Sequence, residues 1–465
     1  METNSLKDGN DKIISITDDN INPHDNKSSE LMLSEDGLGG ESTPGVTGCL
    51  RRWFGPIGGG SLRGSTIAMA SITFGGGCLA FPNAVAQTGP IVAAIVFIIV
   101  AIFSYYTLYI LLDSGLKAQV MDYNNLIEKT MGKKMVFFSD INNLILCIGV
   151  IMSYQLTVYN FALELGYIYF GVEKTSINKL IVISFCFVLI QMPLSLLKNI
   201  SSLQYASMVG TVALIYSIFI IVIESFWYFP LYHDKQGIDL PPNSDLFRAP
   251  HLGYFDTFST FLFGFASHNG IFQVFDELKR PSSQRYKKVL ARSFYIELVL
   301  YISIAFGGFY STFYQTPDVF LKRQDVLFDG KDYLIHIAKV TLFICLHCVM
   351  AINYNIMRMS FKSMFFNNQT IPFVKDFFIT LVTYIISNVA VFFIEDVTQI
   401  LGVIGGFCTV VICFINPIMI HIKLSGKPHT ALSNVIAWSI LIFVTVFGTA
   451  ATIKSLVFNF LPKTE

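Results

Sequence analysis

Charged residues are scarce in this sequence: Asp, Glu, Lys and Arg make up 14% of its 465 residues, whereas a soluble globular protein usually has about 25%. Hydrophobic residues make up 53%, and the mean hydropathy is +0.57. The composition therefore excludes an ordinary soluble protein and predicts an all-α chain that crosses a lipid bilayer many times. The 32 basic residues balance the 32 acidic ones, so no nucleic-acid partner is implied.

The sequence also lacks the motifs that carry reaction chemistry. It has no nucleotide-binding glycine loop followed by lysine, and no catalytic arrangement of nucleophile and base. We therefore expect neither an enzyme nor a primary pump, and no cofactor. None of the eight cysteines lies in a predicted outer loop, so we expect no disulfide. Cys345 and Cys348 form a C-x-x-C pair inside an apolar run, where packing is the simpler interpretation.

Residues 1–50 differ from the rest of the chain. They contain no aromatic residue, and their ten acidic residues outnumber their three lysines. Such a segment cannot bury enough apolar surface to fold alone. It also lacks the basic start and apolar core of a signal peptide. We predict a disordered, acidic cytoplasmic tail, with a cytosolic partner protein left open.

The rest of the chain contains eleven apolar runs, each long enough to cross about 30 Å of hydrocarbon. They lie near residues 65–90, 90–112, 140–168, 179–198, 203–230, 255–275, 293–314, 334–356, 372–394, 397–422 and 432–458. With the N-terminus inside, the inner loops hold sixteen Lys and Arg residues and the outer loops seven. The positive-inside rule then predicts a cytoplasmic N-terminus and an extracytoplasmic C-terminus.

Two of these runs are predicted to be interrupted. The first contains three consecutive glycines, Gly75 to Gly77, and then Pro82, which weaken a helix and remove a backbone donor. The sixth holds Ser267, His268 and Asn269 between two glycines. A broken span persists only inside protein or beside a polar cavity. Interrupted spans five apart predict an inverted repeat of spans 1–5 and 6–10, plus an eleventh span. The alternative for the glycines is close helix packing.

Three features together resemble the amino acid/auxin permease family, which includes sodium-coupled neutral and vacuolar amino acid transporters. They are FGGGCLAFPNAVAQTG at 74–89, FGFASHNGIFQVFDELKRP at 263–281, and eleven spans behind a hydrophilic tail. The resemblance covers residues 63–458, which we treat as one transmembrane amino acid transporter domain. It implies the leucine-transporter-type fold, with an amino acid bound between broken spans 1 and 6.

The resemblance also implies a set of binding residues. The N–H groups of Gly75, Gly76 and Gly77 suit an α-carboxylate. The α-ammonium would take carbonyl oxygens from two segments, Ser71 to Phe74 and Phe263 to Ala266. The predicted substrate-binding set consists of Ser71, Thr73, Gly75, Gly76, Gly77, Phe265, Ala266, Ser267, Tyr154 and Asn353.

The coupling ion is either a proton or sodium. Sodium-coupled relatives carry an asparagine where this sequence has Ser71, so we favour a proton, with Ser71 and Thr73 as the sodium ligands otherwise. His268 is the predicted proton-carrying residue, because histidine titrates near neutral pH; its alternative role is to hydrogen-bond the interrupted backbone. Glu297, placed near the inner end of the seventh span, has a simple ion pair with Arg292 or Lys288 as its expected role.

These observations predict a secondary active transporter that moves neutral amino acids by alternating access. The alternative is a sensor that keeps the same amino-acid site and signals through the tail. The chain is expected in the plasma membrane or in a vacuolar or lysosomal membrane.

Overall fold

The computed structural model describes residues 60–196, 200–236, 246–248, 251–323, 327, 332–366 and 369–460. Every regular element in these ranges is a helix, so the prediction of an all-α protein is confirmed for this part of the chain. The tail predicted over residues 1–50 lies outside it.

Within the described ranges, nine helices are long and apolar enough to cross a membrane. They are α5 (Pro90–Ala118), α7 (Lys133–Phe170), α8 to α9 (Ser176–Leu196), α10 (Ile200–Gln236), α13 (Ser283–Thr312), α14 (Tyr333–Phe365), α15 (Phe373–Phe393), α16 to α17 (Val397–Ser425) and α18 (Leu432–Phe460). A bent pair of helices at the start of the chain makes a tenth candidate. Each lies over an apolar run that the sequence predicted. The predicted total of eleven also counts α11 (Gly253–Gly264) and α12 (Ile271–Asp276), which are too short to qualify separately.

The first apolar run forms three helical pieces: α3 (Leu62–Thr73), the 3₁₀ helix η1 (Gly76–Ala80) and α4 (Phe81–Thr88). Ser61 caps α3 by accepting a hydrogen bond from the Gly64 N–H. Phe74 and Gly75 are extended, and the axes on either side differ by 54°. Pro82 lies in the first turn of α4, where its missing donor costs nothing. The glycines therefore lie at the interruption, and the proline starts the helix that follows it.

The sixth apolar run is divided in the same way. Helix α11 ends at Gly264 and α12 begins at Ile271. The intervening residues form backbone hydrogen bonds between close sequence neighbours. Ala266 N–H donates to Phe263 O at 3.0 Å, and Gly270 N–H donates to Ser267 O at 3.1 Å. The segment between the helices is thus a compact turn.

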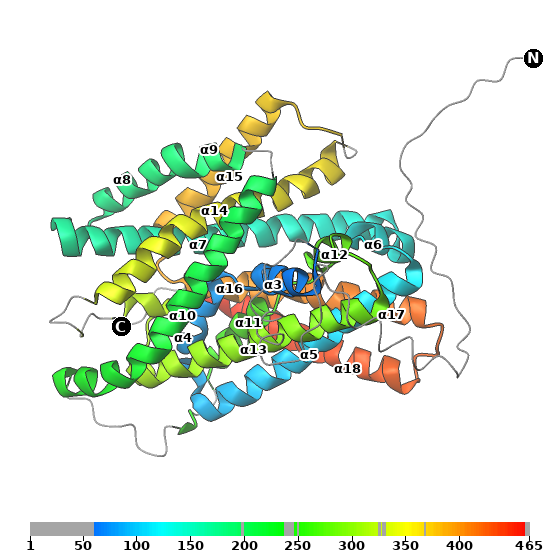
Figure 1. Cartoon of the computed structure of the whole chain (residues 1–465), viewed down its shortest axis with the longest axis horizontal. Helices are drawn as coiled ribbons and strands as arrows, with labels where there is room; N and C mark the ends of the chain where they lie inside the picture. Colours follow the sequence, from blue (N-terminus) through cyan, green and yellow to red (C-terminus); the bar gives the residue numbers. More distant parts are fainter. Residues whose placement is uncertain are drawn as a thin grey trace, which may run out of the picture. The chain divides into compact units, whose positions relative to one another are not determined.

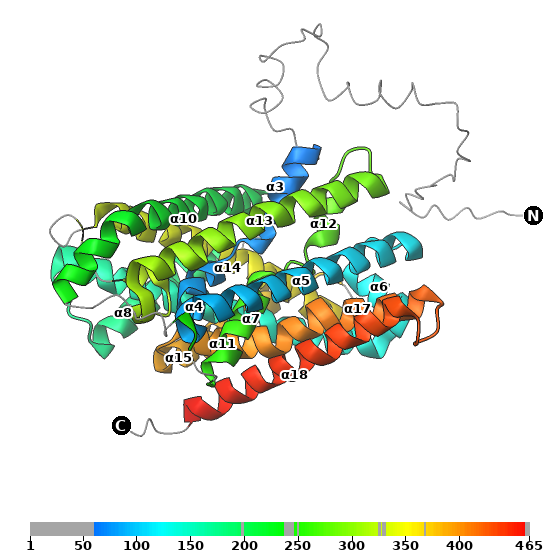
Figure 2. The ribbon, with the colours of Figure 1, turned by 90° about the horizontal axis from the view of Figure 1, so that it is seen from below.

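Helix α13 packs against α3, α4 and α10, and it lies between α10 and α5 in both ribbon views (Figures 1 and 2). Helix α14 packs against α7 and α10, and α11 packs against α4 and α16. The two interrupted runs are therefore enclosed by longer helices.

Helix α18 lies along the edge of the bundle beside α16 and α17 (Figure 2). Small residues form this contact. Gly402 lies against Ser455, and the backbones of Gly406 and Gly448 approach so closely that neither position has room for a Cβ atom. This is the small-residue packing by which helices associate within a bilayer.

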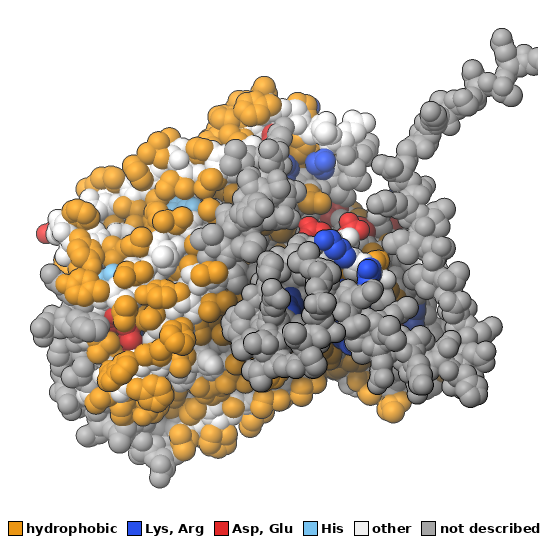
Figure 3. Space-filling model, viewed as in Figure 1, with side chains coloured by type: hydrophobic (Ala, Val, Ile, Leu, Met, Phe, Trp, Pro, Cys, Tyr) orange, Lys and Arg blue, Asp and Glu red, His pale blue; other side chains and the backbone are white. Residues whose placement is uncertain are grey.

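Large apolar side chains point outward from the predicted spans. On α8 (Ser176–Cys186) and the π-helix η2 (Phe187–Gln191) that continues it, they recur every three or four residues, as one face of a helix requires. They are Ile177, Leu180, Ile181, Phe185 and Val188. Hydrophobic side chains cover the described part of the face over α8 and α14 (Figure 3). Such surface is expected against lipid rather than water.

One helix was not predicted. The short α6 (Tyr123–Met131) follows α5 and is capped by Asp122, whose carboxylate accepts the Asn125 N–H at 2.8 Å. It is tied to the bundle by Tyr123, whose hydroxyl donates to the Ile412 carbonyl oxygen at 2.6 Å. Its nine residues are too few to span a bilayer, which is why a search for long apolar runs missed it.

Candidate functional site

A cavity of about 230 Å³ lies where the two interrupted runs meet. Its walls come from the end of α3, from η1, α7, α10, α13 and α14, and from the segment between α11 and α12. Pockets for drug-sized ligands occupy about 300–1,000 Å³. This smaller volume suits a compact molecule.

Eight of the eleven predicted site residues line this cavity. They are Ser71, Thr73, Gly75, Gly77, Tyr154, Ala266, Ser267 and Asn353. Gly76 begins η1 between two lining glycines. Phe265 and His268 are not among the lining residues; Phe265 packs against the rings of Phe97, Phe294 and Tyr301 instead.

The first interruption presents backbone donors to the cavity. None of the described hydrogen bonds uses the N–H of Gly75 or Gly77, as expected at the start of a helix. A Cβ atom would lie 2.5 Å from the Tyr154 hydroxyl at Gly75, and 2.6 Å from the Phe263 ring at Gly77. The glycines therefore permit close packing, and the binding of a carboxylate by their amides stays a prediction.

The same interruption leaves acceptors at the end of α3. No described hydrogen bond uses the carbonyl oxygens of Ser71 or Ile72, since the last carbonyls of a helix have no partner within it. The Thr73 carbonyl oxygen accepts the Tyr301 hydroxyl at 2.9 Å. Helix α3 thus ends in carbonyl oxygens, and η1 begins with N–H groups beside them.

The second interruption contributes fewer free carbonyls than the sequence suggested. Phe263 O and Phe265 O accept backbone hydrogen bonds, and Gly264 O accepts the Tyr301 hydroxyl at 2.9 Å. Ser267 supplies a side-chain group instead: its Oγ is buried, lines the cavity, and has no partner among the described residues.

His268 faces away from the cavity. Its Nε2 lies 2.9 Å from Thr107 Oγ1 on α5, and its ring lies near Phe414. The side chain is 1% exposed. The described hydrogen bond of the ring is therefore to a side chain of α5 rather than to the interrupted backbone, and both predicted roles of His268 stay predictions.

Glu297 is placed differently from the expectation. It is buried within α13, and its Oε1 lies 3.0 Å from Thr73 Oγ1. Arg292 and Lys288 are exposed, and neither forms an ion pair with Glu297. The expected ion pair is wrong because these residues point to the outer side of α13, whereas Glu297 points toward α3.

Sequence reasoning missed several polar lining residues. Tyr301 lies one turn after Glu297, and its hydroxyl contacts the ends of both α3 and α11. Asn269 donates to Asn143 Oδ1 on α7 at 2.8 Å, and Gln273 lies nearby in the lining. The available signal was the i, i+4 spacing of Glu297 and Tyr301, which places them on one helix face.

The lining contains no Asp, Glu, Lys or Arg side chain in the described part of the chain. Its apolar area is formed largely by aliphatic residues. They are Leu146, Val150, Leu214, Leu342, Leu346, Val349, Ile352 and Ile356. A ligand with a net side-chain charge would find no counter-ion here, which is costly away from water.

The two predicted sodium ligands, Ser71 and Thr73, already use their hydroxyl groups in hydrogen bonds. Ser71 Oγ donates to Ile67 O at 2.8 Å, and Thr73 Oγ1 is already bonded to Met69 and Glu297. Along α14, the lining offers Cys345 and aliphatic side chains, with Asn353 as the oxygen-bearing residue. Hard cations are bound by several oxygen ligands.

Three other acidic groups are paired with cations. Arg323 lies between Glu224 and Asp332, 2.9 Å from the latter, and 4.2 Å from the centre of the Tyr228 ring. Lys339 pairs with Glu164 at 3.0 Å. These groups link α7, α10 and α14.

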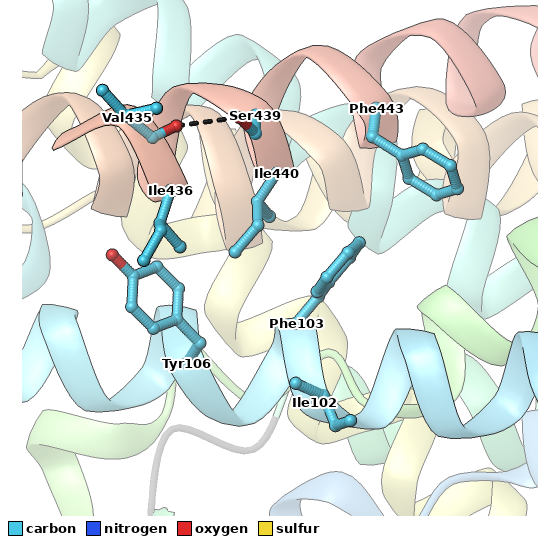
Figure 4. A pocket seen from close by; sticks show the side chains of 8 residues that line it. All are labelled: Ile102, Phe103, Tyr106, Val435, Ile436, Ser439, Ile440 and Phe443. Carbon is cyan, nitrogen blue, oxygen red and sulfur yellow. Dashed lines mark hydrogen bonds between the residues drawn. The ribbon is translucent and has the colours of Figure 1, made fainter. Parts of the chain in front are cut away.

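A second hollow of about 480 Å³ lies between α5 and α18 (Figure 4). It is lined by apolar residues together with Tyr106 and Ser439, and the Ser439 hydroxyl already donates to Val435 O at 2.9 Å. Without converging polar groups, it is a poor site for a zwitterion.

Comparison with known proteins adds independent information. Residues 58–460 match the family model described as "Transmembrane amino acid transporter protein". The sequence is 22% identical to "Sodium-coupled neutral amino acid transporter 4" of Rattus norvegicus over 426 residues, 78% of each chain. It is 26% identical over 318 residues to "Putative amino acid transporter AAT1" of Toxoplasma gondii, covering 67% of this chain but only 42% of that one.

The chain is also similar to two solved transporter structures. The inward-facing conformation of Mhp1 has a TM-score of 0.49 with 10% identity, covering 86% of this chain and 89% of that one. A Na⁺-coupled sialic acid symporter has a TM-score of 0.47 with 12% identity, covering 86% and 96%.

Proposed function

This chain belongs to the transmembrane amino acid transporter family, and from that premise we propose that it is a secondary active transporter of neutral amino acids. Its matched relatives are transporters rather than enzymes. The protein alternates access to its cavity between the two sides of the membrane, with a free amino acid as its substrate.

The observation that carries this proposal is the composition of the cavity wall. No described hydrogen bond uses the N–H groups of Gly75 and Gly77 or the carbonyl oxygens of Ser71 and Ile72, and none of the described lining residues carries a charged side chain. The N–H groups bind the α-carboxylate and the carbonyl oxygens bind the α-ammonium. The aliphatic wall then receives an uncharged side chain.

The proposed fold has eleven spans in the leucine-transporter-type arrangement. In this arrangement α3 to α4 form a broken first span, α11 to α12 form a broken sixth span, and α18 is the eleventh. The interruptions at Phe74–Gly75 and at 265–270 support it, because they lie five spans apart. Residues 63–458 then form one transport domain behind the 1–50 tail.

We propose that the coupling ion is the proton. The hydroxyl groups of Ser71 and Thr73 are already hydrogen-bonded, and α14 adds one oxygen-bearing residue, Asn353, to the lining, which favours the proton over sodium. His268 remains a predicted proton-carrying residue, although it lies beside Thr107 rather than in the cavity wall.

The test is uptake of radiolabelled amino acids into proteoliposomes, under an imposed pH gradient or an imposed sodium gradient. We expect leucine-like and other neutral amino acids to accumulate with the pH gradient alone, and arginine and glutamate to compete poorly. Protein-free liposomes are the control. Accumulation that needs sodium would contradict the coupling proposal, and folded protein that moves no amino acid under either gradient would contradict the function.

A further inference from the structure

Glu297 is an unusual carboxyl group for its position. It is the fifteenth of the thirty residues of α13, is 1% exposed, and lies level with the interruption of the first apolar run. Among the other fully buried carboxyl groups described, Glu224 and Asp332 flank Arg323, and Asp376 pairs with Arg358. Asp140 lacks a cation but lies near the start of α7, where it accepts from Asn124 at 3.1 Å.

Among the described residues, no cation faces Glu297 from the elements packed around it. Helix α3 presents Thr73, with Arg63 as its charged residue three turns away, and α4 has no titratable residue. Tyr301 of α13 is the neighbouring titratable group, and Cys78 of η1 and Tyr154 of α7 lie near Tyr301 in turn. Helix α5 meets α13 through Tyr105 and Tyr109, and the described side chains of α10 place Glu224 at the far end with Arg323.

The hydrogen bonds indicate which form of the carboxyl group is present. Thr73 Oγ1 has one hydrogen, yet it lies 3.0 Å from Glu297 Oε1 and 3.3 Å from Met69 O. Met69 O can only accept. If Glu297 is neutral, its O–H donates to Thr73 and Thr73 donates to Met69, which satisfies both contacts. If Glu297 is ionised, two acceptors compete for one hydrogen and the charge is buried without a cation.

Glu297 is also coupled to both interruptions. Tyr301, one turn further along α13, is the donor to Thr73 O and Gly264 O. A movement of α3 relative to α13 would therefore separate Thr73 from Glu297 and change the contacts at the cavity wall. A carboxyl group that loses this partner and meets water becomes an ordinary acid.

We propose that Glu297, hydrogen-bonded to Thr73, is the proton-carrying residue of this chain. It is a neutral acid in the conformation described. When α3 moves away and water enters, the O–H bond breaks heterolytically, the proton passes to water and the carboxylate remains. Reprotonation at the opposite face restores the neutral acid. This inference rests on the proposed transport function.

The experiment compares wild type with Glu297→Gln in proteoliposomes, with the membrane potential clamped to zero. Glutamine keeps the size and can donate to Thr73, but it cannot release a proton. A gradient of one pH unit supports about tenfold accumulation for one proton per substrate. We expect about that ratio for wild type and a ratio near one for Glu297→Gln. Exchange of labelled for unlabelled amino acid should stay within about twofold of wild type.

One further variant sharpens the test. Asp140→Asn removes the other buried carboxyl group that lacks a cation in the described part of the chain, and it should accumulate substrate as wild type does. Accumulation by Glu297→Gln, or an equal loss in Asp140→Asn, would overturn the assignment to Glu297. A wild type that neither accumulates nor exchanges amino acids would overturn the transport function, and the assignment with it.

Discussion

The hydroxyl of Tyr301 lies 2.9 Å from the carbonyl oxygen of Thr73 and 2.9 Å from that of Gly264. One side chain of α13 thereby contacts the last turns of α3 and α11, which are separated by almost two hundred residues. The ring itself is buried among Phe74, Phe81 and Phe265.

Replacing Tyr301 with phenylalanine should keep this aromatic packing and remove the shared donor. We expect the free energy of unfolding to fall by about 1–3 kcal/mol, because two buried carbonyl oxygens lose a partner. We also expect slower uptake. Denaturant titration in detergent and initial uptake rates measure the two effects. An unchanged stability would show that water or a rearranged backbone replaces the hydroxyl.

Gly75 and Tyr154 form a pair that can be tested by a double mutant. In Gly75→Ala the new Cβ would lie 2.5 Å from the Tyr154 hydroxyl, whereas the next atom of that ring is 3.7 Å away. The single variant should lose about 1–3 kcal/mol of stability. Adding Tyr154→Phe removes the clashing oxygen and should recover most of the loss. Equal stability of the single and double variants would place the strain elsewhere.

Ser267 should contribute to substrate affinity. Its hydroxyl is buried, lines the cavity and has no described partner, so it is available to a ligand. Ser267→Ala should raise KM about tenfold with little change in maximum rate, as expected when one hydrogen bond is lost equally in the bound state and the transition state. Ser65→Ala is the matched control: Ser65 Oγ is also buried and unpartnered, but it is not in the lining. Similar effects of both would argue against ligand contact.

Arg323 should be among the residues most important for stability. Arg323→Met would leave Glu224 and Asp332 buried without their cation, and we expect a loss of about 3–5 kcal/mol. The triple variant Arg323→Met, Glu224→Gln, Asp332→Asn removes all three charges and should be more stable than the single variant. Thermal unfolding in detergent measures which of the two variants is more stable. The reverse order would mean that the carboxyl groups are already neutral.

The orientation of the chain can be checked with tags. Eleven spans with a cytoplasmic N-terminus put the two termini on opposite sides, so an N-terminal epitope should require permeabilisation for labelling and a C-terminal one should not, at a cell-surface location. Two termini labelled from the same side would contradict the odd number of spans.

Deleting residues 1–50 should leave uptake unchanged.

Much of the fold could be predicted because its signals are local. Apolar runs mark the long helices, since about 20 apolar residues are needed to cross a bilayer. Gly75 to Gly77 and the Gly264–Gly270 pair mark the interruptions, because glycine disfavours a continuing helix. Most of the site residues predicted around these two interruptions line the cavity. Helix α6 was missed because it is short and amphipathic rather than apolar.

The environment of individual polar side chains could not be predicted in this way. Glu297 meets Thr73 across 224 positions of sequence, and His268 meets Thr107 across 161. Which face of α13 points inward depends on how α3 and α10 pack against it. In the sequence, Glu297 lies close to Arg292 and Lys288, which suggested an ion pair. In a helix, however, residues five positions apart, such as Arg292 and Glu297, point to different faces.

Helix α18 packs against α16 and the π-helix η7 (Ile404–Cys408), and this contact has a consequence for how the chain is assembled. Gly402 and Gly406 present bare backbone, and α18 fills the groove with Gly448 and Ser455. A chain cut in the 426–431 loop should therefore reassociate with a separately expressed α18. A chain that ends before Leu432 would expose the groove to other helices, and it should be removed by membrane quality control.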